Sequence, residues 1–291
     1  MKLNHIYNEN CIDFMEKIKT DSILVDIIIT SPPYNIGLKY GKYYNDNQPK
    51  KEYLNRMKTV ARKSLGILKD NGSFFLNVGF TSKNPLLSFE IASIFEQVGY
   101  KIQNTIIWLK SISIDKEDIG KSNGSISEGG SIGHFKPINS DCYLSNLYEY
   151  VFHFTKTGNI KLNKLAIGVP YQDKSNKTRG KFIKPDLRDR GNVFLTTYET
   201  IQEKRPHPSV FPMKLPKKCI KLHGYNKNTI VYDPFMGIGT TALACIDLGV
   251  NYLGTEINTE YVHEAEQKIN NKQNLLWIRK KKEKIGVGET N

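Results

Sequence analysis

Cysteine is scarce in this chain, and its spacing excludes two common structural devices. The four cysteines show no Cys-x-x-Cys spacing and no paired histidines accompany them; they are Cys11, Cys142, Cys219 and Cys245. Disulfide frameworks and zinc sites depend on such spacings. We therefore expect neither a disulfide-stabilised fold nor a bound metal.

Long apolar runs are absent and acidic residues are outnumbered. No apolar run approaches the roughly 18 residues that span a bilayer, and the first residues do not lead into a signal peptide. We expect a cytoplasmic protein that makes no use of a membrane. Against 29 acidic residues stand 42 Lys and Arg, which give a net charge of +13 and a pI near 9.3. This excess suits a polyanionic partner.

The 291 residues are enough for one α/β domain with an insertion. Apolar periodicity predicts alternating strands and helices at 25–29 (strand), 52–68 (helix), 73–78 (strand), 85–98 (helix) and 102–109 (strand). Asp70-Asn71-Gly72 is expected to end the first of these helices. The alternation is typical of a doubly wound, mostly parallel sheet.

The regular pattern stops at residue 111. Residues 120–133 are too rich in Gly and Ser to pack a core, 148–155 alternate like a strand that pairs with the preceding one, and 156–205 are strongly basic. We interpret 111–205 as an insertion that contacts nucleic acid through Lys177, Arg179, Lys181, Arg188 and Arg190. The Tyr- and Lys-rich loop 37–44 predicts further contacts through Lys39 and Lys42. A solvated insertion and an ordinary surface loop remain the alternatives.

Four residues after the first buried strand suit chemistry on a planar amine. Ser31 supplies a hydroxyl, Pro32 and Pro33 form a stiff turn whose carbonyls can only accept, and Tyr34 supplies an aromatic face. Acceptors outside the plane of a base would draw the hydrogens of its exocyclic amine toward tetrahedral geometry and free the nitrogen lone pair. The strand's carboxyl end is where open α/β sheets bind ligands. A proline turn with Tyr34 in a packing role is the alternative.

A second motif near the far end predicts a nucleotide-binding turn. Asp233-Pro234-Phe235-Met236-Gly237-Ile238-Gly239-Thr240-Thr241 lies between a strand at 228–232 and a helix at 242–248, and a further strand at 252–255 ends at Glu256. Glycines let the backbone approach a ligand, and Glu256 lies where an acid binds a ribose diol. Asp233, expected at the mouth of the turn, would repel a pyrophosphate but suits the ammonium and sulfonium of S-adenosylmethionine. A nucleotide-dependent oxidoreductase would share the geometry.

Both motifs resemble those of amino-methyltransferases, which use S-adenosylmethionine to methylate exocyclic nitrogens of DNA bases. The resemblance implies a Rossmann-like methyltransferase fold, and because Ser31-Pro32-Pro33-Tyr34 precedes the cofactor motif, it implies the circularly permuted β group. The segment 207–212 resembles the family segment that packs against the methionine end of the cofactor. In the commoner form of that segment, Lys stands where this chain has Phe211. The implied cofactor contacts are Cys11, Ile12 and Asp13 beside the adenine, Ser209 in the segment against the methionine end, and Asp233, Phe235, Gly237, Gly239, Thr240, Thr241 and Glu256 in the turn.

The resulting hypothesis is a DNA methyltransferase that flips cytosine out of the duplex and methylates its N4, since the serine-first motif is more often associated with N4-cytosine in that family. The alternatives are N6 of adenine and, less favoured, a non-catalytic basic DNA-binding protein with the same fold. The expected partner is double-stranded DNA; a companion restriction endonuclease and a monomer or homodimer stay open. The expected organisation is a catalytic part at 1–110, a target-recognition insertion at 111–205 with a core strand at 148–155, a cofactor-binding part at 206–273 and a basic tail at 274–291.

Overall fold

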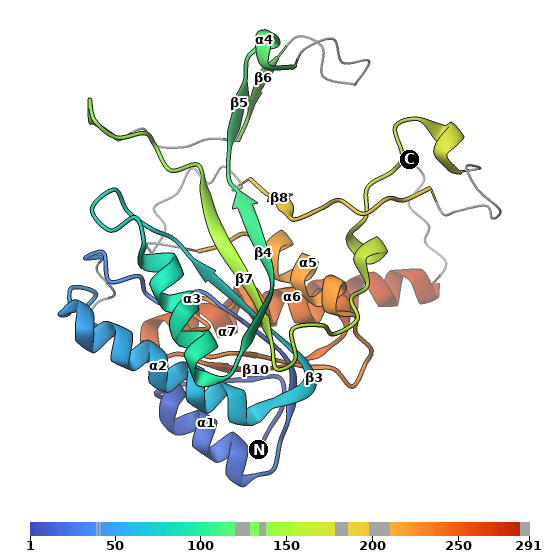
Figure 1. Ribbon diagram of the computed structural model, residues 1–291. Coiled ribbons are helices and arrows are strands. Elements are labelled where there is room, and N and C mark those ends of the chain that lie inside the picture. Colours follow the sequence, from blue (N-terminus) through green and yellow to red (C-terminus); the bar gives the residue numbers. More distant parts are fainter. Residues whose placement is uncertain are drawn as a thin grey trace.

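The computed structural model describes residues 1–38, 40, 42–119, 129–133, 138–177, 186–197 and 210–285, apart from the side chains of 176–177 and 279–285. Its centre is an eight-stranded sheet in the order β1-β10-β9-β2-β3-β7-β4-β8 (Figure 1). Only β7 runs antiparallel to its neighbours among these described strands, which confirms the predicted, mostly parallel sheet. The strands are β1 (His5–Tyr7), β2 (Val25–Thr30), β3 (Leu68–Val78), β4 (Lys101–Leu109), β7 (Tyr148–Thr155), β8 (Val193–Leu195), β9 (Ile230–Asp233) and β10 (Asn251–Thr255).

Helices cover both faces of this sheet (Figure 1). On one face lie α1 (Cys11–Thr20), α2 (Lys50–Ile67) and α3 (Leu87–Val98); on the other lie α5 (Lys214–His223), α6 (Thr240–Leu248) and α7 (Thr259–Ile285). Each helix turns an apolar stripe to the strands, as Phe14, Met15 and Ile18 of α1 do. The result is two hydrophobic cores separated by the sheet.

Strand β3 begins earlier than the sequence predicts. Helix α2 stops at Ile67, within one residue of its predicted end, but β3 begins at Leu68 and not at Ser73, so that residues 70–72 lie inside the strand. Val25 pairs with Leu68, but Ile27 pairs with Ser73, so the extra residues of β3 form a bulge. Pairing with β2 therefore overrides the turn signal of Asp70-Asn71-Gly72.

The insertion contributes two strands to the main sheet. As predicted, β7 pairs with the preceding strand β4, and it also pairs with β3. The edge strand β8, only three residues long, was not predicted. Because β7 runs antiparallel to its neighbours, its first residues lie beside the carboxyl ends of the parallel strands.

The remaining elements of the insertion are small. The hairpin of β5 (Ile112–Ile114) and β6 (Gly130–Ile132), with α4 (Lys116–Ile119), projects beyond the end of β4 (Figure 1). Two 3-10 turns follow β7, η1 (Lys164–Ile167) and η2 (Lys174–Lys177). Within the residues described, no helix combines the length and apolarity that a membrane span requires.

Candidate active site

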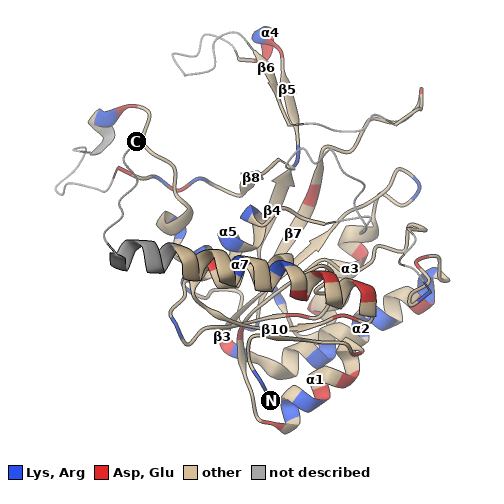
Figure 2. Cartoon of the chain, turned by 180° about the vertical axis from the view of Figure 1, so that it is seen from behind, with Lys and Arg blue, Asp and Glu red and all other residues tan. Residues whose placement is uncertain are grey.

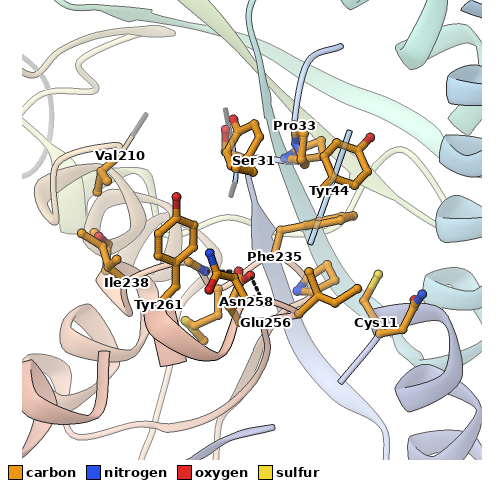
Figure 3. Close-up of a pocket in the computed structure, with 18 of the residues that line it drawn as sticks. Cys11, Ser31, Pro33, Tyr44, Val210, Phe235, Ile238, Glu256, Asn258 and Tyr261 are labelled. Atoms are coloured by element: carbon orange, nitrogen blue, oxygen red, sulfur yellow. Dashed lines mark hydrogen bonds between the residues drawn. The ribbon is translucent and has the colours of Figure 1, made fainter. Parts of the chain in front are cut away.

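The two sequence motifs open onto one cavity. Strands β2 and β9 are parallel neighbours, so the turns that follow Thr30 and Asp233 both leave the sheet at the carboxyl ends of its parallel strands. An open cavity lies between them (Figure 3). Its lining includes Ser31, Pro32, Pro33 and Tyr34 from the first motif and Phe235, Gly237, Thr240 and Glu256 from the second. The two motifs therefore face each other across the cavity.

The turn after β2 is held from both sides. The hydroxyl of Tyr53, on α2, donates a 2.8 Å hydrogen bond to the carbonyl of Pro33. On the other side the buried carboxylate of Asp46 accepts backbone N–H bonds from Asn35 at 2.8 Å and Ile36 at 3.1 Å. These bonds stabilise the left-handed conformation of Asn35, whose φ is 57°. The proline turn is therefore rigid before any ligand arrives.

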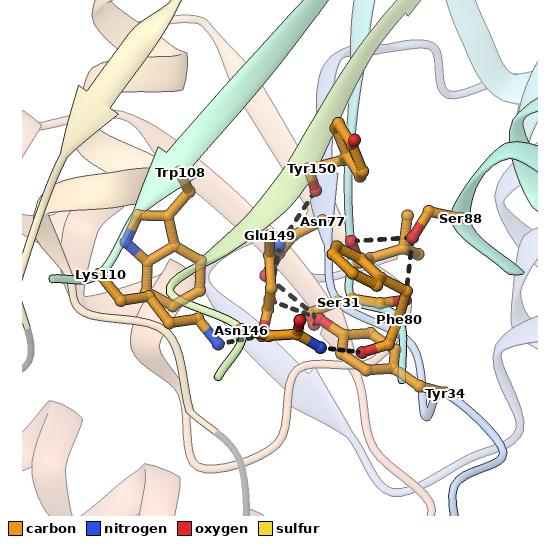
Figure 4. A network of polar contacts seen from close by, with 12 residues as sticks. Ser31, Tyr34, Asn77, Phe80, Ser88, Trp108, Lys110, Asn146, Glu149 and Tyr150 are labelled. Atoms are coloured by element: carbon orange, nitrogen blue, oxygen red, sulfur yellow. Dashed lines mark hydrogen bonds and ion pairs between the residues drawn. The ribbon is translucent and has the colours of Figure 1, made fainter. Parts of the chain in front are cut away.

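Tyr34 is fixed by hydrogen bonds to its hydroxyl (Figure 4). The Tyr34 Oη lies 2.8 Å from Ser31 Oγ and 2.9 Å from Oε2 of Glu149, the second residue of β7. Glu149 also accepts a 2.9 Å bond from Asn77 Nδ2 and forms an ion pair with Lys110. A Cβ at Gly79 would come 2.9 Å from Tyr34 Cε2, so the glycine leaves room for the ring. Tyr34 lines the cavity while only 8% exposed.

The glycine turn contacts Glu256 directly. Gly237 and Gly239 adopt φ values of 54° and 87°, which favour glycine. The N–H of Gly237 donates a 2.9 Å bond to Glu256 Oε2, and the N–H of Asn258 donates a 2.8 Å bond to Oε1. Burial raises the pKa of the Glu256 carboxyl above its ordinary value. Each oxygen keeps a lone pair for a further donor such as a ribose hydroxyl.

Asp233 is not at the mouth of the turn, where the sequence placed it. It is buried beneath the cavity, 1% exposed. Its oxygens accept bonds from Thr30 Oγ1 at 2.7 Å and Thr241 Oγ1 at 2.6 Å. Burial raises the pKa of Asp233 to about 6. The residue does not line the cavity; its two hydrogen bonds instead join β2 and α6 beneath it.

Of the other predicted cofactor contacts, Cys11 lines the cavity, whereas Ile12, Asp13, Gly239 and Thr241 do not. Cys11 lines it, and burial raises the pKa of its thiol to about 12, so the thiol is neutral. Ile12 instead packs against the core, and Asp13 is exposed on the first turn of α1. Gly239 packs against α7, where a Cβ would come 2.9 Å from that of Ala265. Thr241 is fully buried, and its hydroxyl donates a hydrogen bond to Asp233.

Several cavity residues were missed by the sequence prediction. Arg56 of α2 reaches the cavity and stacks 4.8 Å from the ring centre of Tyr44. Tyr261 of α7 and Asn258 line the opposite wall (Figure 3). The aromatic richness of 37–44 was a signal for Tyr44, but Arg56 and Tyr261 lie within ordinary helices and had none.

The basic residues predicted to contact DNA differ in their surroundings. Lys42 is exposed beside Tyr43, and Arg188 is exposed while its backbone bridges to Val169. Arg190 is partly buried, since its Nε donates a 2.7 Å bond to the carbonyl of Ile167. Lys and Arg are also spread over α1, α2 and α5 (Figure 2). Lys177 ends η2, and the residues outside the described part of the chain are Lys39, Arg179, Lys181 and Ser209.

A family model described as DNA methylase, covering methylation at N6 and N4, matches residues 25–267. The chain belongs to this DNA methylase family. The type II methyltransferase M.BglII of Bacillus subtilis is 30% identical, over 98% of this chain and 76% of the relative. M1.MboII of Moraxella bovis is 27% identical, over 93% of this chain and 98% of the relative. The solved PvuII cytosine-N4-specific DNA methyltransferase has the same fold, with a TM-score of 0.61 and 19% identity over 92% of this chain and 90% of that one.

The protein is therefore a type II DNA methyltransferase of the N4/N6 amino-methyltransferase family that uses S-adenosylmethionine. Its cavity fits this cofactor: it offers the Glu256 carboxylate for a ribose diol and aromatic walls, including Phe235 and Tyr44, for an adenine. In the part of the chain that the structure describes, no three His, Cys, Asp or Glu side chains gather as a metal site would require.

Proposed function

We propose that this methyltransferase acts on N4 of cytosine in duplex DNA, after rotating the base out of the helix into the cavity. The observation that carries the proposal is the serine that opens the rigid turn, 2.8 Å from the Tyr34 hydroxyl and at the cavity wall. N6 of adenine is the alternative, since an adenine amine presents the same two N–H donors.

In the proposed complex Ser31 Oγ and the Pro32 carbonyl accept the two hydrogens of the target amine. The Pro33 carbonyl is the weaker candidate because Tyr53 already occupies one of its lone pairs. Tyr34 stacks on the base, a contact worth about 1–3 kcal/mol. When bound, S-adenosylmethionine supplies a methyl group on a positively charged sulfur. The turn thus acts by positioning and electrostatics, without a covalent enzyme intermediate.

Mass spectrometry of nucleosides tests this proposal. Purified protein, mixed-sequence duplex DNA and methyl-labelled cofactor are incubated, and the DNA is digested. N4-methylcytosine is the expected product, whereas N6-methyladenine would establish the alternative. DNA without label would favour a non-catalytic DNA-binding protein.

Replacing the ring tests the role of Tyr34. Tyr34→Ala is expected to spare cofactor binding while reducing turnover by about tenfold or more, because the stacking contact is lost. Isothermal titration of the cofactor and single-turnover kinetics measure the two quantities. Unchanged turnover would remove the stacking role.

We further propose a cytoplasmic protein that works beside a companion restriction endonuclease, as the names of its type II relatives suggest. Sequencing that detects modified bases in the host genome would give the methylated base and its sequence context. An endonuclease that cuts the same sequence only when it is unmethylated would identify the companion.

A further inference from the structure

The reversed strand β7 brings a charged residue to the catalytic turn. Glu149, the second residue of β7, is 8% exposed and lies opposite Trp108 of β4. It forms an ion pair with Lys110, in which the side chains are 11% and 19% exposed. Burial of a carboxylate is costly unless it is paired, and the ion pair and the bond from Asn77 provide that pairing. In its ionised form this carboxylate accepts hydrogen bonds and cannot donate them.

Acceptors on two sides decide where the Tyr34 proton goes. Asn77 Nδ2 donates to Glu149 and, at 3.1 Å, to the carbonyl of Tyr150, so that its Oδ1 faces the Tyr34 hydroxyl at 3.4 Å. Glu149 Oε2 lies closer, at 2.9 Å, and takes the phenol proton. A phenol has one proton. The 2.8 Å contact with Ser31 must therefore be a bond that Ser31 donates.

This direction of donation determines what Ser31 presents to the cavity. With its single proton on Tyr34, the serine oxygen has only lone pairs left for a ligand. We propose that Glu149, held by Lys110, makes Ser31 an obligate acceptor and so selects bases with an exocyclic amine over bases with a carbonyl at that position. Glu149 is a positioning residue, because it acts through Tyr34 and Ser31. The inference rests on the proposed contact between Ser31 and the target amine.

Glu149→Gln tests the direction of the hydrogen bonds that run from Ser31 through Tyr34 to Glu149, because it changes the shape of the side chain little. The amide can donate to Tyr34, which frees the phenol proton for Ser31 and lets the serine proton turn to the cavity. The matched control is Asp247→Asn on α6. The Asp247 carboxylate is similarly buried and is paired with Lys217 of α5 and Lys272 of α7, away from the hydrogen bonds of Tyr34. Cofactor affinity and melting temperature show that each variant is folded.

The readout is the binding of two duplexes that differ only at the target, once product mapping has identified it: one carries the amine and the other the corresponding carbonyl base, uracil for cytosine or hypoxanthine for adenine. We expect the wild type and Asp247→Asn to prefer the amine by about tenfold or more, and Glu149→Gln to lose that preference to within about twofold of equality. Both duplexes carry an abasic site opposite the target, so that neither base is paired and the cost of flipping does not favour the carbonyl base.

The outcomes separate two failures. If the wild type shows no preference for the amine, the proposed role of Ser31 is wrong. If the wild type and Glu149→Gln prefer it equally, Ser31 stands and the role of Glu149 is wrong. Should Glu149→Gln fail to fold, Tyr34→Phe carries the test, since it keeps the ring and interrupts the chain at Oη. Retention of the amine preference by Tyr34→Phe would overturn the inference, and its loss would support it.

Discussion

The hydroxyl of Thr30 donates a 2.7 Å hydrogen bond to Asp233 Oδ1 and joins the last residue of β2 to the last residue of β9. The other oxygen of Asp233 accepts from Thr241, in the first turn of α6. One buried carboxylate therefore links the strand that carries the catalytic turn to the turn and helix that carry the cofactor motif. The separation of the two motifs is fixed by this link.

Removing the link should weaken cofactor binding without removing a contact to the cofactor. Asp233→Ala leaves the buried hydroxyls of Thr30 and Thr241 without their acceptor, a loss of about 1–3 kcal/mol each that the glycine turn can relieve only by shifting. We expect the cofactor dissociation constant to rise by tenfold or more (about 1.4 kcal/mol). Isothermal titration measures it, with Thr30→Val, which removes one of the two bonds, as a milder comparison. An unchanged constant would show that the turn keeps its shape without Asp233.

Acid should destabilise the protein through His153. Burial, reinforced by His223, lowers the pKa of His153 from 6.5 to about 3. Asn104 Nδ2 lies 3.0 Å from Nδ1, and Ser73 Oγ 2.9 Å from Nε2, so a proton added at Nδ1 would meet a donor. The unfolded chain binds this proton below about pH 6.5, whereas the folded protein binds it only near pH 3. The free energy of unfolding is therefore highest above pH 6.5 and declines as the pH falls toward 3, by up to about 5 kcal/mol.

Urea unfolding at pH 7, 5.5 and 4 measures this decline. His153→Gln cannot titrate at this position and should show a flatter decline than the wild type, although it is less stable at pH 7. Parallel curves for the two proteins would assign the acid sensitivity to other groups.

Gly79→Ala should displace Tyr34. The added Cβ would come 2.9 Å from Tyr34 Cε2 and 3.3 Å from Glu149 Cγ, and neither the ring nor the buried glutamate is free to move away. We expect single-turnover methylation to slow by about tenfold or more, with cofactor affinity unchanged. Gly66→Ala is the control, because its Cβ would meet nothing within 4 Å and α2 should gain up to about 1 kcal/mol. Normal turnover in Gly79→Ala would show that the ring position is not critical.

The basic residues should separate into two groups by their salt dependence. Lys42→Ala and Arg188→Ala, both of exposed residues, are each expected to reduce the salt slope of non-specific DNA binding by about one. Arg190→Ala should instead lower the melting temperature, because its side chain bonds to Ile167 and packs 6.0 Å from the ring centre of Phe194. Binding titrations at several salt concentrations give the slopes. A slope change confined to Arg190→Ala would reverse this assignment.

Local patterns predicted the elements that carry the site. The run before Thr30 and the alternation at 148–155 were enough to place β2 and β7, because both strands are long and bounded by clear changes of composition. The three-residue β8 was missed because it forms only through its pairing with β4. The start of β3 was misplaced for a similar reason, since the pairing of Leu68 with Val25 decides it.

The site was predicted where function depends on local geometry and missed where it depends on distant contacts. Proline fixes φ and glycine permits a positive φ at their own positions, so both turns could be read from the sequence. Asp233 was assigned to a ligand because its hydroxyl partners, Thr30 and Thr241, are brought to it by folding. Glu149 gave no signal, since an acid in an alternating strand usually faces water.

The pairing of β4 with β7 has an evolutionary consequence. Residues 110–147 leave the sheet at the end of β4 and return at the start of the adjacent β7, and the two strands are in register over their whole length apart from one bulge. A segment closed at its base in this way can lengthen, shorten or be exchanged between relatives while the parallel strands keep their places. Should residues 111–205 contact the target, as the sequence predicts, a changed loop would alter the recognised DNA sequence and leave the catalytic turn after β2 in place.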